Sequence, residues 1–345
     1  VLVTGAGGSI GAELARQLAA LAPEKLILLD QSEYVLYRID LEISEAFPEV
    51  FRTIEITDVR DLLRLEKVFS ETKPEIVFHA AALKHVPIVE RNVLEGILTN
   101  IFGTVNIADA SRKHQVSHMV LISTDKAVNP TSIMGATKRL AECYCQAQDR
   151  LEETNDTRFI TVRFGNVLGS TGSVVPLFRR QLEHGGPLTV THPDMSRYFM
   201  TIREAVELVL QAAALGAGKT EGQVPRGNIC VLDMGEPVKI IDLARQMIRL
   251  AGLRPYKDVD INIVGLRPGE KLFEEIFHGS ESLVPTECAG ILLAAPRAAD
   301  INALERGLER LRDHCNKIDQ REAIVTLREL VPEYIGDANE EKHRD

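Results

Sequence analysis

The sequence lacks any apolar run of about 18 residues or more, which is the length a helix needs to cross a bilayer. It also lacks a basic leader followed by an apolar stretch, so we expect neither a membrane span nor a secretion signal within this chain. Residues 1–3 nevertheless read as the end of a buried strand that leads straight into a glycine-rich loop. We therefore expect the chain to be part of a longer polypeptide.

Cysteine is scarce and scattered. The five cysteines are an odd number and contain no C-x-x-C pair, which argues against a disulfide framework and a structural metal site and suits a reducing cytoplasm. An excess of basic charge is also absent, because 40 Lys and Arg face 50 Asp and Glu and give a net charge of -10. This balance argues against nucleic-acid binding through a general basic surface, but it leaves room for a local basic pocket that binds an anion.

Apolar runs of strand length alternate with amphipathic stretches along the first half of the chain, which is the βαβ rhythm. We predict strands at 26–30, 53–56, 76–80, 119–123 and 159–164, and a Rossmann-like α/β fold with a doubly wound parallel sheet. After about residue 165 the pattern loosens, with helices near 203–214, 241–251 and 302–331. The expected organisation is a cofactor-binding domain at 1–165, an interleaved substrate lobe at 166–335 and a frayed tail at 336–345.

The first loop has glycines at a spacing that suits a dinucleotide. It follows a strand, opens a helix and matches G-x-x-G-x-x-G, which lets the backbone approach a pyrophosphate. The residues expected to contact a cofactor here are Gly5, Gly8, Ser9, Ile10 and Gly11. The alternative interpretation is a tight turn without a ligand.

Acidic and small residues follow the next three predicted strands. Asp30 ends the second strand, where a carboxylate can accept hydrogen bonds from a ribose and repel a 2′-phosphate, so NAD is expected rather than NADP. Asp58 and Val59 are expected near the adenine, although Asp58 has helix capping before the next residues as an alternative. Ala80 and Ala81 follow the fourth strand, where small side chains let the backbone approach the cofactor.

An acid, an amine and a hydroxyl stand together at the end of the fifth predicted strand. They are Thr124, Asp125 and Lys126, and open parallel sheets bind ligands at this edge. A helix is predicted to begin near residue 132, which places Met134 and Lys138 one turn apart on the same face. A surface ion pair is the alternative for the acid and the amine.

With these residues in place, the chain resembles the extended short-chain dehydrogenases/reductases, and among them the UDP-N-acetylglucosamine 4,6-dehydratases of polysaccharide biosynthesis. The resemblance runs from residue 1 to about 275, and its motifs are HAAALKHVP at 79–87, STDKAVNPT at 123–131, RFGNVLGSTGSVVPLF at 163–178, THPDMSRYFM at 191–200 and GLRPGEKLFEE at 265–275. Methionine at 134, where tyrosine is usual, resembles the branch that retains configuration at C5. That branch implies a cytoplasmic catalytic part of a membrane-anchored protein, and a homo-oligomer is expected.

The resemblance implies a reaction and a role for each residue of the strand end. NAD oxidises the sugar at C4, the C5 proton and the C6 hydroxyl are lost, and the hydride returns to C6. Asp125 would protonate the departing hydroxyl, Lys126 would remove the C5 proton and Thr124 would bind the C4 oxygen. Lys126 can act as a base only if its pKa is lowered, which we expect from burial near Lys138 and a cationic nicotinamide.

The thioether of Met134 cannot take the C4 hydroxyl proton. The sequence leaves two acceptors open, ionised Asp125 or a water held by Thr124 and Lys138. A further alternative is that Met134 is core packing in an enzyme that has lost its activity.

The resemblance also implies a pocket for a UDP-sugar. Asn166, Ser173 and Val174 are expected at the diphosphate and uridine, with Arg197 and Arg267 as cationic contacts. Two further residues expected to bind substrate are Glu270, at the uridine ribose, and Lys84, facing the sugar. The alternatives are structural salt bridges for the arginines and a solvated loop for the lysine.

Two rival functions follow from the same fold. A UDP-sugar 4-epimerase shares the first hydride step but needs a proton shuttle at C4, against which Met134 and the Asp125–Lys126 pair argue. A non-catalytic dinucleotide sensor also explains the loss of tyrosine, but it gives no reason to keep the acid, the amine and the diphosphate motifs together.

Overall fold

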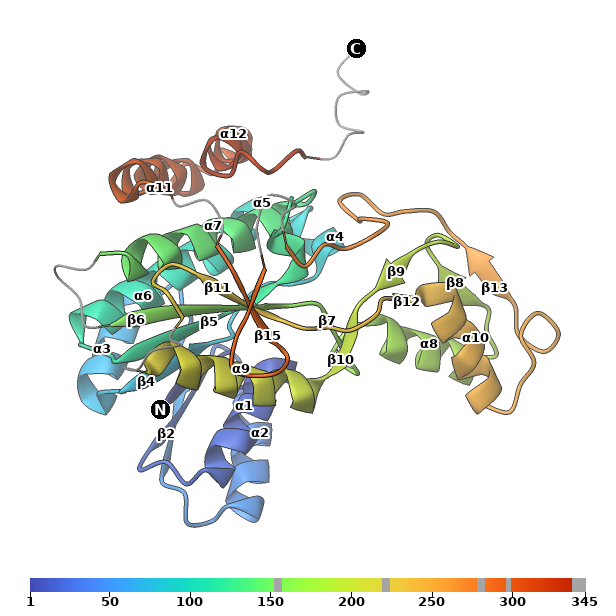
Figure 1. Ribbon diagram of the computed structural model, residues 1–345, viewed down its shortest axis with the longest axis horizontal. Coiled ribbons are helices and arrows are strands. Elements are labelled where there is room, and N and C mark those ends of the chain that lie inside the picture. The colour runs from blue at the N-terminus through green and yellow to red at the C-terminus, as the bar shows by residue number, and fades with distance from the viewer. Residues whose placement is uncertain (152–156, 219–223, 278–282, 296–298, 337–345) are drawn as a thin grey trace.

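The computed structural model describes residues 1–151, 157–218, 224–277, 283–295 and 299–336. Nine strands of these residues form one central sheet in the order β14-β15-β11-β6-β5-β4-β1-β2-β3 (Figure 1). They are β1 (Leu2–Thr4), β2 (Leu26–Asp30), β3 (Arg52–Ile56), β4 (Ile76–His79), β5 (His118–Thr124), β6 (Arg158–Phe164), β11 (Ile229–Leu232), β14 (Val284–Pro285) and β15 (Ile291–Ala294). From β3 to β11 the pairs are parallel, whereas β15 and β14 join antiparallel. The predicted doubly wound Rossmann-like fold is confirmed.

The central strands are buried on both faces because most of their positions are apolar, whereas the edge strand β3, RTIEI, is partly exposed. Ile27 and Leu29 pack with the helices of one layer, and Leu26 and Leu28 with those of the other. One layer contains α1 (Ser9–Ala20), α2 (Glu33–Ala46) and α9 (Ile202–Ala217). The other contains α3 (Leu62–Thr72), α6 (Gly103–Lys113) and α7 (Ile133–Asp149), and Figure 1 shows the two layers above and below the strands.

Most predicted elements occur within one or two residues of their expected bounds. Strand β2 coincides with its prediction, and α7 begins after Ser132, whose hydroxyl accepts a hydrogen bond from the Gly135 N–H. The expected helical stretch at 302–331 is divided into α11 (Ile301–Asn316) and α12 (Gln320–Leu330). The division falls at Ile318, whose φ of 57° lies in the left-handed region that a β-branched residue rarely adopts. Both helices pack on the outer side of α7 (Figure 1).

Beyond β6 the chain leaves the sheet and builds a smaller body, seen at the right of Figure 1. Its elements are α8 (Val174–Glu183), β8 (Leu188–Val190), β9 (Ser196–Arg197), β12 (Val238–Lys239), α10 (Ile240–Leu250) and β13 (Ile261–Ile263). Phe178, Val190 and Ile248 form its separate core. The parallel pair β7 (Asn166–Leu168) and β10 (Phe199–Thr201) connects this body to the sheet, to which the chain returns at β11.

Short helical turns connect the strands near the carboxyl edge of the sheet. They are α4 (Val86–Val89), α5 (Val93–Gly96), η1 (Ile97–Phe102) and η2 (Asp125–Ala127). In the described part of the chain all five cysteines are free, and no three His, Cys, Asp or Glu side chains gather as a metal site. None of the helices described is both long and apolar enough to cross a membrane. The predicted frayed tail lies outside the described residues except for Gly336.

Candidate active site

The glycine loop between β1 and α1 packs directly against the loop that follows β4. Gly5 has a φ of 65°, and a Cβ there would lie 2.7 Å from the Ala81 nitrogen. A Cβ at Gly11 would lie 1.9 Å from the Gly5 carbonyl oxygen, so the start of α1 can approach the turn only without a side chain. At Gly8 a Cβ would meet only the Gly5 oxygen, at 3.3 Å, and Gly8 lines the cavity described next. Packing therefore explains Gly5 and Gly11, whereas Gly8 leaves room for a ligand.

The residues expected at a cofactor line two adjoining cavities. A cavity of about 590 Å³, which we call the cofactor cleft, is lined by Gly8, Ser9, Ile10, Gly11, Asp30, Ala80 and Lys138. A side cavity of about 150 Å³ is lined by Gly5, Gly8, Asp30, Asp58, Val59, Ala80 and Ala81. The structure therefore brings together every cofactor residue that the sequence indicated.

Asp30 and Asp58 are both held by hydrogen bonds, in different ways. The Asp30 carboxylate accepts one bond from the Gly7 N–H and one from the Ser32 N–H, each at 3.1 Å. A carboxylate has about four acceptor positions, so Asp30 retains capacity for the two hydroxyls of a ribose. Asp58 instead binds the Arg60 side chain and N–H, which outweighs partial burial and lowers its pKa. Asp61, not Asp58, caps α3.

The acid and the amine at the end of β5 form an inward-facing pair. Asp125 is fully buried, and its Oδ1 accepts hydrogen bonds from the Thr124 hydroxyl and the Lys126 Nζ, both at 2.9 Å. Thr124 and Lys126 line the cofactor cleft, whereas Asp125 lies behind them. The surface ion pair considered from the sequence is therefore wrong, because neither carboxylate oxygen reaches solvent.

The expected lowering of the Lys126 pKa is also wrong for this chain. Burial disfavours the ammonium, but the carboxylates of Asp125 and Glu274 outweigh it and raise the pKa of Lys126. The amine lies 3.3 Å from the Asn166 Oδ1 and 3.6 Å from the Glu274 Oε1. Lys126 is therefore an ammonium ion at neutral pH in the structure, and a base only after it has lost a proton.

Met134 and Lys138 face the same cleft from the first turns of α7. Met134 is buried in the core under the sheet edge and still contributes to the cleft wall. The Lys138 Nζ donates a hydrogen bond of 2.7 Å to the Ile122 carbonyl, and burial lowers the pKa of Lys138 to about 8. Among the described residues Lys138 forms no ion pair like that of Lys126 with Asp125, and the charge of Glu142 only partly offsets burial, so Lys138 loses its proton more readily.

Two buried side chains that sequence reasoning assigned no role fix the loop after β4. His79 lies between the hydroxyls of Thr4, at 2.7 Å, and Thr104, at 3.1 Å, and burial lowers its pKa to about 3. Asn100 accepts from the Leu83 N–H at 2.8 Å and donates to the Leu83 carbonyl at 2.9 Å. The sequence signal for His79 was a polar residue at the end of the apolar strand β4. The contact of Asn100 with the Leu83 backbone forms only in the folded chain, so no sequence signal was available for it.

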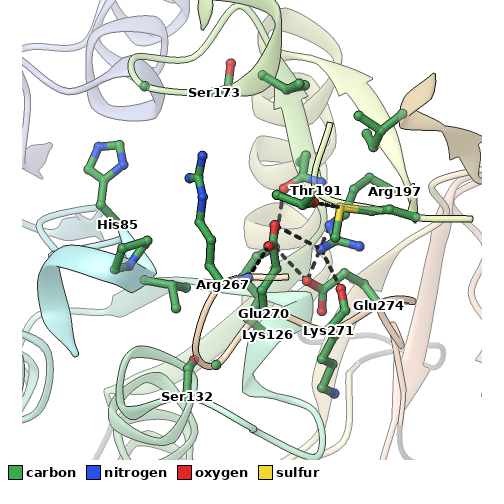
Figure 2. A pocket seen from close by; sticks show the side chains of 18 of the residues that line it. His85, Lys126, Ser132, Ser173, Thr191, Arg197, Arg267, Glu270, Lys271 and Glu274 are labelled. Carbon is green, nitrogen blue, oxygen red and sulfur yellow. Dashed lines mark hydrogen bonds and ion pairs between the residues drawn. The ribbon is translucent and has the colours of Figure 1, made fainter. Parts of the chain in front are cut away.

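A third cavity, of about 270 Å³, lies between the smaller body and the sheet edge (Figure 2). We call it the lobe cavity. It is lined by all the residues expected to bind a substrate, which are Lys84, Asn166, Ser173, Val174, Arg197, Arg267 and Glu270. Lys84, Lys126, Asn166 and Ser173 line the cofactor cleft as well. The two cavities therefore adjoin along these shared residues, and Lys126 is one of them.

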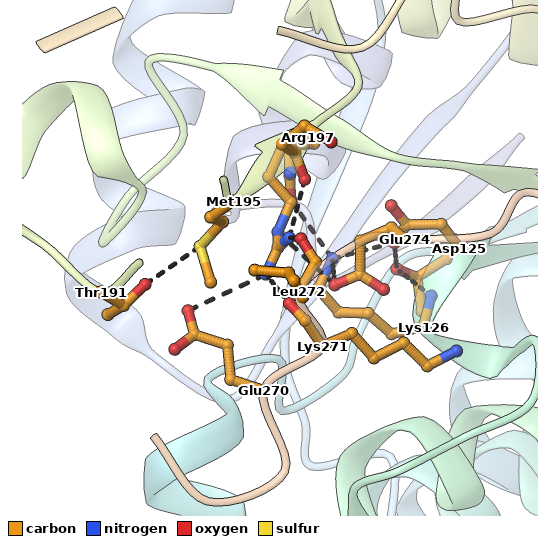
Figure 3. A network of polar contacts seen from close by, with 12 residues as sticks. Asp125, Lys126, Thr191, Met195, Arg197, Glu270, Lys271, Leu272 and Glu274 are labelled. Atoms are coloured by element: carbon orange, nitrogen blue, oxygen red, sulfur yellow. Dashed lines mark hydrogen bonds and ion pairs between the residues drawn. The ribbon is translucent and has the colours of Figure 1, made fainter. Parts of the chain in front are cut away.

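The two arginines of the lobe cavity differ in what their guanidinium groups do. Arg197 is buried and donates to the carbonyls of Ser196, Lys271 and Leu272 at 2.7 to 3.1 Å, so it anchors the segment after β13 (Figure 3). Arg267 is exposed and reaches into the cavity (Figure 2). The backbone N–H of Arg267 donates to the Glu270 Oε2 at 3.1 Å. Of the two guanidinium groups, that of Arg197 is engaged by backbone carbonyls, whereas that of Arg267 is open to the lobe cavity.

Glu274 is a site residue that the sequence analysis missed. It is 7% exposed, lines the lobe cavity, and its Oε1 lies 3.6 Å from both the Lys126 Nζ and the Arg197 Nε (Figure 3). Its Oε2 is buried and has no hydrogen-bond partner among the described residues. The available signal was the pair of glutamates that ends the GLRPGEKLFEE motif.

The chain is similar in sequence to several known proteins. Capsular polysaccharide biosynthesis protein CapD of Staphylococcus aureus is 51% identical over 282 residues, which are 81% of this chain and 45% of CapD. The chain thus spans about half the length of that relative. An inverting UDP-N-acetylglucosamine 4,6-dehydratase of Campylobacter jejuni is 31% identical over 91% of this chain and 90% of its own length. A UDP-glucose 4-epimerase of Rickettsia canadensis is 32% identical over 96% and 94%.

Solved structures show the same fold. Pen of Bacillus thuringiensis superposes with a TM-score of 0.75 at 31% identity, over 87% of this chain and 88% of Pen. The dTDP-glucose 4,6-dehydratase DesIV of Streptomyces venezuelae gives 0.66 at 23% identity, over 80% and 87%. A family model described as polysaccharide biosynthesis protein matches residues 1–296. The chain therefore belongs to the polysaccharide biosynthesis protein family.

Proposed function

We propose that the chain catalyses the NAD-dependent 4,6-dehydration of UDP-N-acetylglucosamine to a UDP-4-keto-6-deoxy sugar for surface glycans. The observation that carries this proposal is that Lys126, which hydrogen-bonds Asp125, lines both cavities. A hydro-lyase needs an acid and a base that act on adjacent carbons, and this pair supplies both at one point. The dehydratase relative supports the same activity.

The cofactor in this proposal is NAD. The open position at Gly8 and the spare acceptor capacity of Asp30 fit a pyrophosphate and an adenosine ribose, and the Asp30 carboxylate would repel a 2′-phosphate. NAD bound there would accept hydride from the sugar C4 and return it to C6. The side cavity at Asp58 and Val59 would take the adenine.

The acid and the base arise together from one proton transfer. When a proton moves from the Lys126 Nζ to the Asp125 Oδ1, across 2.9 Å, the ion pair becomes a neutral amine and a carboxylic acid. The amine then removes the C5 proton and the acid protonates the departing C6 hydroxyl. When hydride is added at C6, the Lys126 ammonium returns a proton to C5, so the sugar loses one water overall. Thr124 and Lys126 cover Asp125, so its proton reaches the sugar through them or after they move.

Of the two acceptors considered for the C4 hydroxyl proton, a water held by Thr124 and Lys138 fits this scheme, whereas Asp125 already takes the Lys126 proton and lies behind the cleft wall. Met134 cannot serve, and its presence supports the configuration-retaining form of the reaction. The pKa of about 8 for Lys138 lets this amine exchange protons with such a water near neutral pH.

The lobe cavity is the proposed site of the nucleotide. The diphosphate lies at the first turn of α8, near Ser173 and Val174, with Arg267 as its cation. Glu270 holds the uridine ribose and Lys84 faces the sugar. In this division residues 1–165 bind the cofactor and 166–335 bind the substrate. The free cysteines suit a cytoplasmic location, and we propose a homo-oligomer as the working form.

A UDP-sugar 4-epimerase is the second candidate, favoured by the Rickettsia relative. The two activities, and the sensor considered from the sequence, are separated by incubating the chain with NAD and UDP-N-acetylglucosamine and measuring product mass. Loss of one water supports dehydration, and an isomer of unchanged mass supports epimerisation. Absence of any product with full NAD binding supports the sensor and refutes our proposal.

A further inference from the structure

Glu274 places a buried carboxylate between the reacting lysine and the nucleotide-binding segment. The segment from Arg267 to Glu274 belongs to no helix or strand in the described chain, yet Glu274 is 7% exposed. Figure 3 shows its carboxylate directed at Lys126 on one side and Arg197 on the other. A carboxylate on an irregular segment is normally solvated, so its burial here has to be balanced by these two cations.

Arg197 fixes the position of the Glu274 carboxylate. The guanidinium donates to the carbonyls of Lys271 and Leu272, at 2.7 and 3.1 Å, and its Nε lies 3.6 Å from the Glu274 Oε1. The same oxygen lies 3.6 Å from the Lys126 Nζ. Because the guanidinium is planar and rigid, the carboxylate has little freedom to move independently of the segment that carries it.

The second oxygen of Glu274 argues against a role in stability alone. The Oε2 is buried without a hydrogen-bond partner among the described residues, which costs stability relative to a satisfied group. An uncharged side chain of similar size would avoid this cost and would still fill the space. The charge is therefore needed for something other than packing.

We propose that Glu274 is a positioning residue that fixes the Lys126 amine at the junction of the two cavities and ties it, through Arg197, to the segment that closes the lobe cavity. The proposal rests on the function proposed above for Lys126. It means that the segment which binds the nucleotide also sets the position and charge of the amine that reacts. Glu274 itself does not touch the reacting carbons.

The groups that surround Lys126 determine the sign of the expected effect. Asp125 from η2 and Glu274 from the segment after β13 favour the ammonium, whereas Arg197 from β9 and Lys84 from the loop after β4 oppose it. Asn166 from β7 is neutral and contacts the amine at 3.3 Å. Removing the Glu274 charge leaves Asp125 as the carboxylate that pairs with Lys126 among the described residues, so Lys126 loses its proton at lower pH.

The test measures Lys126 directly and does not depend on turnover. NAD-loaded protein is treated with acetic anhydride over a range of pH, and modification of the Lys126 peptide is followed by mass spectrometry. In Glu274→Gln we expect the midpoint of modification to fall by about one pH unit or more. Glu274→Asp keeps the charge at a greater distance and should shift the midpoint less. The control Glu275→Gln, at the exposed neighbour that accepts from Asn129, should match the wild type.

Kinetics distinguish positioning from general damage. In Glu274→Gln kcat should fall about tenfold, with KM within about twofold because Arg197 still holds the segment through its carbonyl bonds. The limb of the pH profile that reports Lys126 should move to lower pH together with the labelling midpoint. A wild-type midpoint in both Glu274 variants would overturn the proposal. A shifted midpoint in protein that makes no product would refute the proposed function and leave this inference standing.

Discussion

The cofactor cleft and the lobe cavity are held in different ways, although Lys126 lines both. Backbone geometry sets the glycine loop of the cleft, where Gly5 and Gly11 allow close packing and Asp30 accepts hydrogen bonds from two N–H groups. The lobe cavity depends on side chains from distant parts of the chain, and Arg197 reaches a carbonyl 75 residues away. The comparison teaches that local backbone geometry sets the glycine loop, whereas the lobe cavity depends on side-chain contacts of the completed fold.

The largest expected effect is on the local side of this comparison. In Gly11→Ala the new Cβ would lie 1.9 Å from the Gly5 oxygen, so the turn must open and NAD binding should be lost. Gly8→Ala is the matched variant, because its Cβ would meet the same oxygen at 3.3 Å and should weaken binding much less. Titration with NAD, followed by calorimetry, checks both. Equal affinities in the two variants would show that backbone packing does not shape the cleft.

The next effect is at the junction of the two cavities. Asp125→Asn and Lys126→Ala should each reduce turnover by roughly a hundredfold or more, because each removes a proton donor or acceptor. NAD affinity should stay near the wild-type value, since the glycine loop and Asp30 are unchanged. Rates of product formation and the same calorimetric titration provide the measurements. Wild-type turnover in both variants would contradict the roles assigned to this pair.

The smallest effect separates the two arginines of the lobe cavity. Arg267→Ala should raise KM for the UDP-sugar about tenfold without changing the melting temperature, because its guanidinium is exposed. Arg197→Lys should lower the melting temperature by several degrees, because lysine cannot replace a fork that donates to three carbonyls. Steady-state kinetics and thermal unfolding check the pair. The reverse pattern would mean that Arg197 binds the nucleotide and Arg267 supports the segment.

The sequence predicted what short-range patterns encode. Strand β2 and the glycine loop followed from an apolar run and glycine spacing, and the predicted helix start near residue 132 agrees with α7. The raised pKa of Lys126 was not predicted, because it depends on the buried ion pair with Asp125 and on Glu274, which only the fold brings within 3.6 Å. Arg197 was expected at a ligand for the same reason. Its partners are the carbonyls of Lys271 and Leu272, which lie on a segment whose sequence shows no periodic pattern.

The antiparallel strands β14 and β15 were also absent from the predicted sheet. β14 has only two residues and leaves no apolar run of strand length, whereas β15 is an apolar run, ILLA, that the prediction did not assign to the sheet. Pairing with β11 decides their conformation, and such long-range pairing leaves little trace in local composition.

The most direct test of the account is the reaction carried out in heavy water with UDP-N-acetylglucosamine and NAD, followed by mass spectrometry of the product. If the amine at the junction removes the C5 proton and one water is lost, the product should lack one water and carry a single deuterium at C5. Lys126→Ala should form neither the product nor the label. A product of unchanged mass, or a dehydrated product formed by Lys126→Ala at the wild-type rate, would contradict the account.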